Sequence, residues 1–201
     1  MAVKTDHALE RLVFFSDAVF AIAITLLVIE IHPPHLPKGS SDLAHIQALA
    51  DLIPSFVGYF VSFMVVGLFW MGHHRAFTLA ARYSPRILGW NMALLGVIAF
   101  MPFVTAYVSA NITQRVPTIG YCVAMLIAAL LNFQTNRTAT SPPMVDPAAD
   151  PRDIRYVRQR GLAVILGSAT AVVVAIFFPR YGQIGLVSIP LWRFVLVRLA
   201  I

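Results

Sequence analysis

Long apolar runs alternate with short polar segments along the whole chain. Each run is close to the roughly 20 residues that a helix needs to cross a bilayer, and proline-rich segments separate several of them. Six spanning helices are predicted, at about residues 11–31, 52–72, 87–109, 118–134, 155–178 and 183–201. The pattern therefore predicts an all-α, polytopic membrane protein in which residues 1–201 form a single six-helix domain.

The first run, residues 11–31, differs from a simple membrane anchor because it carries charges. Only twelve uncharged residues separate Asp17 from Glu30. As a helix they measure roughly 18 Å, whereas the hydrocarbon core of a bilayer is about 30 Å thick. Either this helix does not span, or its charged ends are drawn to membrane depth. Since an ionisable residue at that depth needs a partner or water beside it, we interpret this segment as a functional helix.

Helical rotation divides the same segment into two faces. With about 100° per residue, Leu26 and Ile29 fall within about 40° of Ile22, and Thr25 about 60° from it. Ser16 and Asp17 fall about 120° and 140° round the helix. The helix thus has an apolar stripe with one hydroxyl and a separate polar spot near its start. Core packing or contact with lipid is the ordinary interpretation of such a stripe.

Composition and charge exclude several classes of protein. Of the 201 residues, 59% are hydrophobic and 12% are charged, whereas soluble domains are about 25% charged. The net charge of +6 could suggest nucleic-acid binding, but the basic residues flank apolar runs, as topology signals do. We therefore expect no nucleic-acid partner. The only cysteine, Cys122, cannot form a disulfide within the chain.

Lysine and arginine are distributed unevenly between the two predicted sides of the membrane. One side has Lys38, Arg115 and Arg180, and the other has the remaining twelve of the 15 basic residues. Those twelve are Lys4, Arg11, Arg75, Arg82, Arg86, Arg137, Arg152, Arg155, Arg158, Arg160, Arg193 and Arg198. Because the basic side faces the cytoplasm, both termini are predicted to be cytoplasmic in a protein of the cell membrane.

Polar residues of the first three helices are predicted to meet at the cytoplasmic end. Asp17 needs hydrogen-bond donors there, and Arg11, Trp70, His74 or Asn91 could supply them. Such residues could instead be ordinary interfacial side chains. The pair His73 and His74 suggests a metal, but neighbours on a helix point about 100° apart and chelate poorly, so no metal or cofactor is expected.

These residues also carry a family resemblance. Arg11-x-x-x-Phe15-Ser16-Asp17, followed by AVFAIAITLLVIEI, resembles the signature of the transmembrane protein 175 family of potassium-permeable channels. The FW-x-x-HHR of residues 69–75 and the WN…F-x-PF of residues 90–103 are similar to that family as well. The resemblance covers the first three helices well, and the last three agree in layout only.

The resemblance implies a homotetramer in the membrane whose subunits each have six helices, with the first helix lining a pore for potassium. Positions that match the family's pore residues are Ile22, Thr25, Leu26 and Ile29. Positions that match its packing network are Arg11, Ser16, Asp17, Trp70, His73 or His74, and Asn91. Potassium would be the permeant ion and not a cofactor, and membrane lipids and other copies of the chain would be its partners.

Two other classes of protein are alternatives to a channel. A secondary transporter would show inverted repeats or interrupted half-helices, and the sequence shows neither. A membrane enzyme could use Asp17 and His74 in acid–base chemistry, but no nucleophile accompanies them. We therefore expect a cation channel that favours potassium, and no enzyme activity.

Overall fold

The computed structural model describes residues 6–111 and 113–199, and Lys4 of the topology count lies outside them. The elements in chain order are α1 (His7–Ile29), α2 (Asp42–Asp51), α3 (Ile53–Phe77), α4 (Pro85–Ala110), α5 (Arg115–Ala139), α6 (Pro151–Phe177), the 3-10 helix η1 (Pro179–Ser188) and α7 (Ile189–Arg198). Among the described residues, α1, α3, α4, α5 and α6 are long and apolar enough to cross a membrane. The predicted all-α class with several apolar helices is confirmed.

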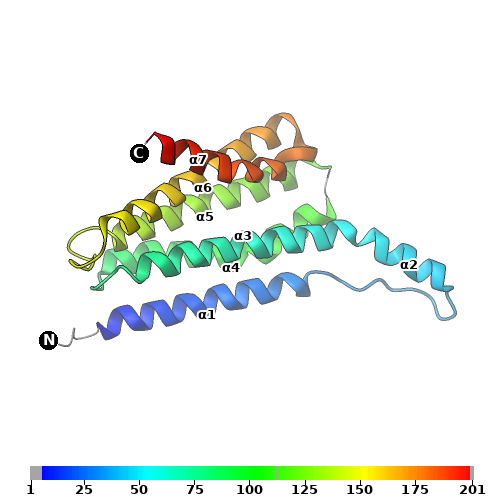
Figure 1. Ribbon diagram of the computed structural model, residues 1–201. Helices are drawn as coiled ribbons and strands as arrows, with labels where there is room; N and C mark the ends of the chain where they lie inside the picture. The colour runs from blue at the N-terminus through cyan, green and yellow to red at the C-terminus, as the bar shows by residue number, and fades with distance from the viewer. Residues whose placement is uncertain (1–5, 112, 200–201) are drawn as a thin grey trace.

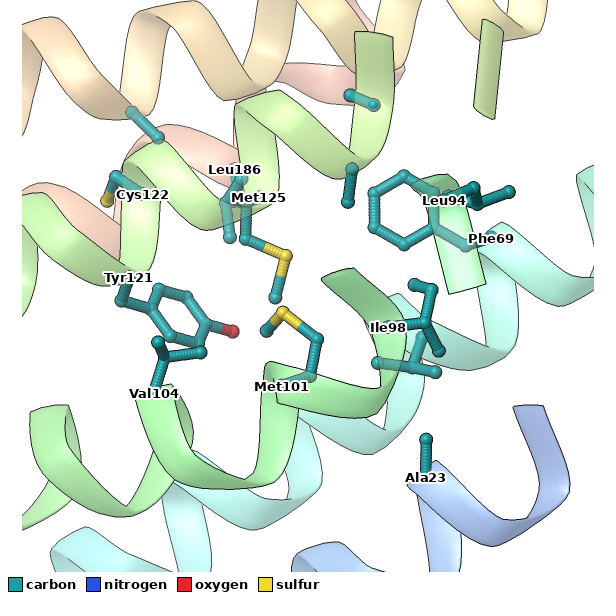
Figure 2. Packing of buried hydrophobic residues seen from close by; sticks show 14 of the residues in the cluster. Ala23, Phe69, Leu94, Ile98, Met101, Val104, Tyr121, Cys122, Met125 and Leu186 are labelled. Carbon is teal, nitrogen blue, oxygen red and sulfur yellow. The ribbon is translucent and has the colours of Figure 1, made fainter. Parts of the chain in front are cut away.

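The long helices lie side by side in an elongated bundle, with α1 along one edge and α7 along the opposite edge (Figure 1). Helices α4 and α5 form the centre, because each buries a larger share of its apolar stretch than the other three long helices do. The side chains of Met101 on α4 and Met125 on α5 point toward each other beside Tyr121 (Figure 2). From α1, Phe20 and Ala23 join the same core cluster.

Residue Asp6 fixes where α1 begins. Its Oδ1 atom accepts hydrogen bonds from the amides of Ala8 at 3.1 Å and Leu9 at 3.4 Å, which makes it the N-cap. Its Oδ2 atom accepts from the amide of Tyr83 at 2.7 Å. The hydrogen bond from Tyr83 is the main reason why the pKa of Asp6 lies below its usual value. One carboxylate thus joins the start of α1 to the α3–α4 connection.

The structure corrects the end of the second predicted spanning helix. Helix α3 continues to Phe77 and not only to the predicted residue 72, so His73 and His74 belong to its last two turns. The reason is burial, because Ala76 and Phe77 are both packed inside the protein and extend the apolar face past the histidines. Residues 42–51, between the first two spanning helices, form α2, which projects beyond the end of the bundle (Figure 1).

The predicted sixth spanning helix, 183–201, is wrong as a continuous helix. The chain instead forms η1 and then the ten-residue α7, which runs back along α6 (Figure 1). Ten residues of α-helix measure about 15 Å, half of the hydrocarbon core. Pro179 opens η1, and the break is stabilised by a long-range contact, because Gly185 lets η1 lie directly against the backbone of Ala171 on α6.

This close approach generates a prediction. A Cβ atom at Gly185 would overlap the backbone of Ala171, so Gly185→Ala should force η1 away from α6 and cost about 1–3 kcal/mol of stability. Gly96→Ala on α4 is the matched control, because a Cβ there meets open space. We expect a lower melting temperature in detergent for Gly185→Ala alone. Equal melting temperatures for the two variants would contradict the packing of η1 on α6.

Candidate functional site: the two faces of helix α1

Helix α1 has one face inside the bundle and one outside it. On the inner face Phe20, Ala23 and Leu27 are at most 2% exposed, and they pack toward α3 and α4. On the outer face Ile22 is 57% exposed and Ile29 is 66% exposed. Leu26 and Thr25 are exposed as well. The four residues of the predicted stripe therefore share the face of α1 that a single chain leaves uncovered.

The hydroxyl of Thr25 is oriented by its own helix. Its Oγ1 atom donates a hydrogen bond to the carbonyl oxygen of Ile22 at 2.8 Å. Because a hydroxyl has one proton and two lone pairs, the proton is used within the helix and the oxygen remains available as an acceptor. An exposed acceptor between apolar side chains can contact a cation that has lost part of its water.

A directed chain of hydrogen bonds holds the inner face of α1 to two other helices. The Nε2 atom of His73 on α3 lies 2.8 Å from Oδ1 of Asn91 on α4, and Nδ2 of Asn91 donates to Oγ of Ser16 at 2.8 Å. Ser16 in turn donates to the carbonyl oxygen of Leu12 at 2.7 Å. Since the Asn91 amide oxygen can only accept, His73 must donate through Nε2.

All three side chains of this hydrogen-bond chain are fully buried. His73, Asn91 and Ser16 are each 0% exposed, so no water competes for their hydrogen bonds. Aromatic rings flank the imidazole of His73, with Phe77 stacked at 4.3 Å and Phe20 at 5.6 Å between ring centroids. The chain of hydrogen bonds therefore sets both the depth and the rotation of α1, because a shift by one residue would leave buried polar groups unpaired.

A second polar contact joins α1 to α3 nearer the surface. The indole Nε1 of Trp70 donates to Oδ1 of Asp17 at 2.8 Å, and the ring of His74 stacks on Trp70 at 5.5 Å. Asp17 is half-buried in the single chain. The reason is its place on α1, at the border between the inner and outer faces.

Arg11 stands apart from these contacts. In the part of the chain that the structure describes, Arg11 makes no hydrogen bond or ion pair, and its side chain is exposed on the outer face of α1. The adjacent His73 and His74 point to different partners, which is the divergence expected for neighbours on a helix. His73 joins the buried hydrogen-bond chain, whereas the ring of His74 stacks on that of Trp70.

Sequence reasoning missed polar contacts deeper in the bundle. Ser62 on α3 lies within hydrogen-bond distance of both Thr105 on α4, at 2.8 Å, and the hydroxyl of Tyr121 on α5, at 3.1 Å. Asn132 on α5 donates to the carbonyl oxygen of Phe69 at 3.2 Å. The signal available in the sequence was the presence of isolated polar residues within the apolar runs, but such residues do not reveal their partners.

Fold and site together define a multi-pass helical membrane protein whose first helix is fixed by buried polar contacts on one side and presents an apolar face on the other. Comparison with known proteins identifies the family. The profile of the family described as endosomal/lysosomal potassium channel TMEM175 matches residues 11–102. These residues include the outer-face stripe and all three members of the buried hydrogen-bond chain.

Relatives extend the similarity over most of the chain. A potassium channel of Chamaesiphon minutus is 34% identical over 154 residues, which cover 75% of each chain. A potassium channel of Streptomyces collinus is 37% identical over 156 residues, 73% of this chain and 74% of that one. The crystal structure of a lysosomal potassium-selective channel TMEM175 homolog from Chamaesiphon minutus matches with a TM-score of 0.77 and 27% identity, over 95% of this chain and 97% of that one. The chain belongs to the TMEM175 family.

The buried hydrogen-bond chain generates a prediction for Asn91. Asn91→Leu leaves the donor of His73 buried without an acceptor, which should cost about 1–3 kcal/mol and lower the melting temperature in detergent. Met92→Leu, a change at the next residue of α4 whose side chain is 38% exposed, is the control and should have little effect. Adding His73→Leu to Asn91→Leu removes the unpaired donor, so the double variant should lose less stability than the sum of the single variants. Additive losses would mean that the two side chains are not coupled.

Proposed function

We propose that this protein forms a homotetrameric, potassium-favouring cation channel in which the outer face of α1 lines the pore. The observation that carries the proposal is the uncovered stripe of Ile22, Thr25, Leu26 and Ile29 opposite a firmly packed inner face. The relatives from Chamaesiphon minutus and Streptomyces collinus are named potassium channels, which supports potassium as the permeant ion. Membership of the TMEM175 family supports an ion channel over an enzyme.

In the proposed tetramer, the stripes of the four subunits surround the pore axis. They would select ions by removing water from them, and they would close the pore by expelling water from it. Apolar rings of Ile22, Leu26 and Ile29 offer an ion no oxygen, so an ion passing them must give up water without replacement. Larger, less tightly hydrated cations lose least in this exchange, which favours potassium over sodium. The ring of Thr25 oxygens would offset part of the loss, and a sufficiently narrow Ile22 ring would close the pore by expelling water.

The polar contacts on the other faces of α1 have a separate role in this proposal. The chain from His73 through Asn91 to Ser16 fixes which residues of α1 face outward within one subunit. Asp17, half-buried and bonded to Trp70, and Arg11, exposed without a partner among the described residues, are available to a neighbouring subunit. We infer that Asp17 serves assembly, because it points away from the stripe.

The test of the pore is single-channel recording of the purified protein in potassium and sodium gradients. The wild type should prefer potassium. Ile22→Asn should wet the narrowest ring, so conductance should rise and potassium preference should fall several-fold. Thr25→Ala should lower the preference for potassium over sodium but should affect closure of the pore less, because it removes the acceptor oxygen and not an apolar side chain.

Val28→Asn is the matched control for the pore test. Val28 is 50% exposed on the same helix but lies about 120° from Ile22, away from the proposed axis. Its substitution should leave conductance and preference unchanged in assembled channels. Wild-type conduction by assembled Ile22→Asn channels would instead place the stripe against lipid.

The orientation of the chain is part of the proposal. The N-terminal end of α1, the α3–α4 connection and the α5–α6 connection lie at one end of the bundle, and the α1–α2 connection lies at the other (Figure 1). The first end has most of the basic loop residues, which supports cytoplasmic termini.

Thiol labelling of intact cells tests the orientation. A cysteine replacing Lys38, exposed between α1 and α2, should react with an impermeant reagent applied outside. A cysteine replacing Ala148, exposed between α5 and α6, should react only after permeabilisation. The native Cys122 is buried, so the unmodified protein gives the background. The reverse labelling pattern would invert the topology.

A further inference from the structure

A groove of about 630 Å³ lies between α3, α6 and α7. Helix α7 packs on α6 and η1, and the groove separates it from α3. Most of its lining is apolar, from Val65 on α3, Val164 on α6 and Ile189 and Phe194 on α7. The groove is therefore distinct from the outer face of α1, which lies along the opposite edge of the bundle (Figure 1).

Two arginines border this apolar groove. Arg160 is the last charged residue of α6, and its Nη2 atom donates to the carbonyl oxygen of Leu68 on α3 at 3.1 Å. The guanidinium of Arg193 on α7 lies 4.9 Å from the ring centroid of Tyr156, one helical turn before Arg160. Neither arginine is paired with a carboxylate among the described residues, because the nearby Asp153 is bound to Arg75 at 2.7 Å.

The arrangement of charge and apolar surface follows the depth of the membrane. Helix α6 has no charged residue between Arg160 and its end at Phe177, so this part of the helix is the part that enters the apolar layer of the membrane. Ala163 and Val164 belong to it and therefore lie deeper than Arg160. Val65 lies deeper than Leu68 on the antiparallel α3 for the same reason. Two guanidinium groups without a carboxylate partner among the described residues, at the edge of an apolar groove, are placed to bind an anion, and planar guanidinium groups bind phosphate in a bidentate manner.

We propose that this groove binds one anionic phospholipid, with the phosphate between Arg160 and Arg193 and an acyl chain along the apolar lining. Its volume lies within the 300–1,000 Å³ that is typical of ligand sites. Basic pockets between helices on the cytoplasmic side are the usual form of anionic lipid sites. The bound lipid fills the space between α7 and α3 and holds the short terminal helix against the bundle.

Native mass spectrometry of the full-length protein in detergent tests this site. Phosphatidylglycerol should remain bound in preference to phosphatidylcholine with the same acyl chains. Arg193→Gln should lower phosphatidylglycerol retention roughly tenfold, because it removes a charge-assisted contact. Arg198→Gln is the matched control, since Arg198 is on the same helix and lies over the ring of Phe194 but does not line the groove. Phosphatidylglycerol should also raise the melting temperature of the wild type more than that of Arg193→Gln.

Three outcomes would overturn the proposal. Equal retention of the two lipids would show that the groove does not select an anion. Equal losses in Arg193→Gln and Arg198→Gln would show that the site is not between α6 and α7. A wild type that retains no lipid and loses its oligomeric state in Arg193→Gln would place a neighbouring subunit in the groove. Because the readout is lipid retention and not ion flux, failure here leaves the proposed channel function untouched.

Discussion

The hydrogen-bond chain from His73 through Asn91 to Ser16 is the interaction on which the arrangement of α1 depends. An apolar helix among other apolar helices in lipid gains little from hydrophobic burial, because lipid tails are as apolar as its neighbours. Directional hydrogen bonds therefore determine the rotation of α1 about its own axis. Each of these three side chains is fully buried and comes from a different helix, so a different rotation or depth of α1 would break the hydrogen bond between Asn91 and Ser16.

Fixing the inner face of α1 determines what its outer face presents. Ile22, Thr25 and Ile29 are exposed because Phe20, Ala23 and Leu27 are packed inside. The Asp17–Trp70 contact lies between the two faces, where a subunit boundary would cover it in the proposed tetramer. The charges that make this helix unusual as an anchor thus lie at its border or near its ends, and the stretch between them is left apolar.

Whereas a chain of hydrogen bonds positions α1, close packing of small residues positions the C-terminal part of the chain. Small residues bring η1 against α6, where Gly185 meets the backbone of Ala171, and the chain then returns as a helix too short to span. This leaves a groove beside α3 instead of a closed six-helix bundle. In the proposed lipid site, Arg160 and Arg193 are brought together by that return, although they are far apart in the sequence.

The sequence by itself determined the class of fold, the positions of the first five spanning helices within a few residues and the stripe on α1, because hydrophobic periodicity is a local property. It also indicated most of the polar residues of the first three helices that meet at one end, although Arg11 stays apart from their contacts. It could not select His73 over His74, extend α3 past its histidines or reveal the contact between Asp6 and Tyr83. Those outcomes depend on which side chains meet across helices. Only the tertiary structure decided that residues 179–198 break into η1 and α7, because the approach of Gly185 to Ala171 is a long-range contact that no local hydropathy pattern contains.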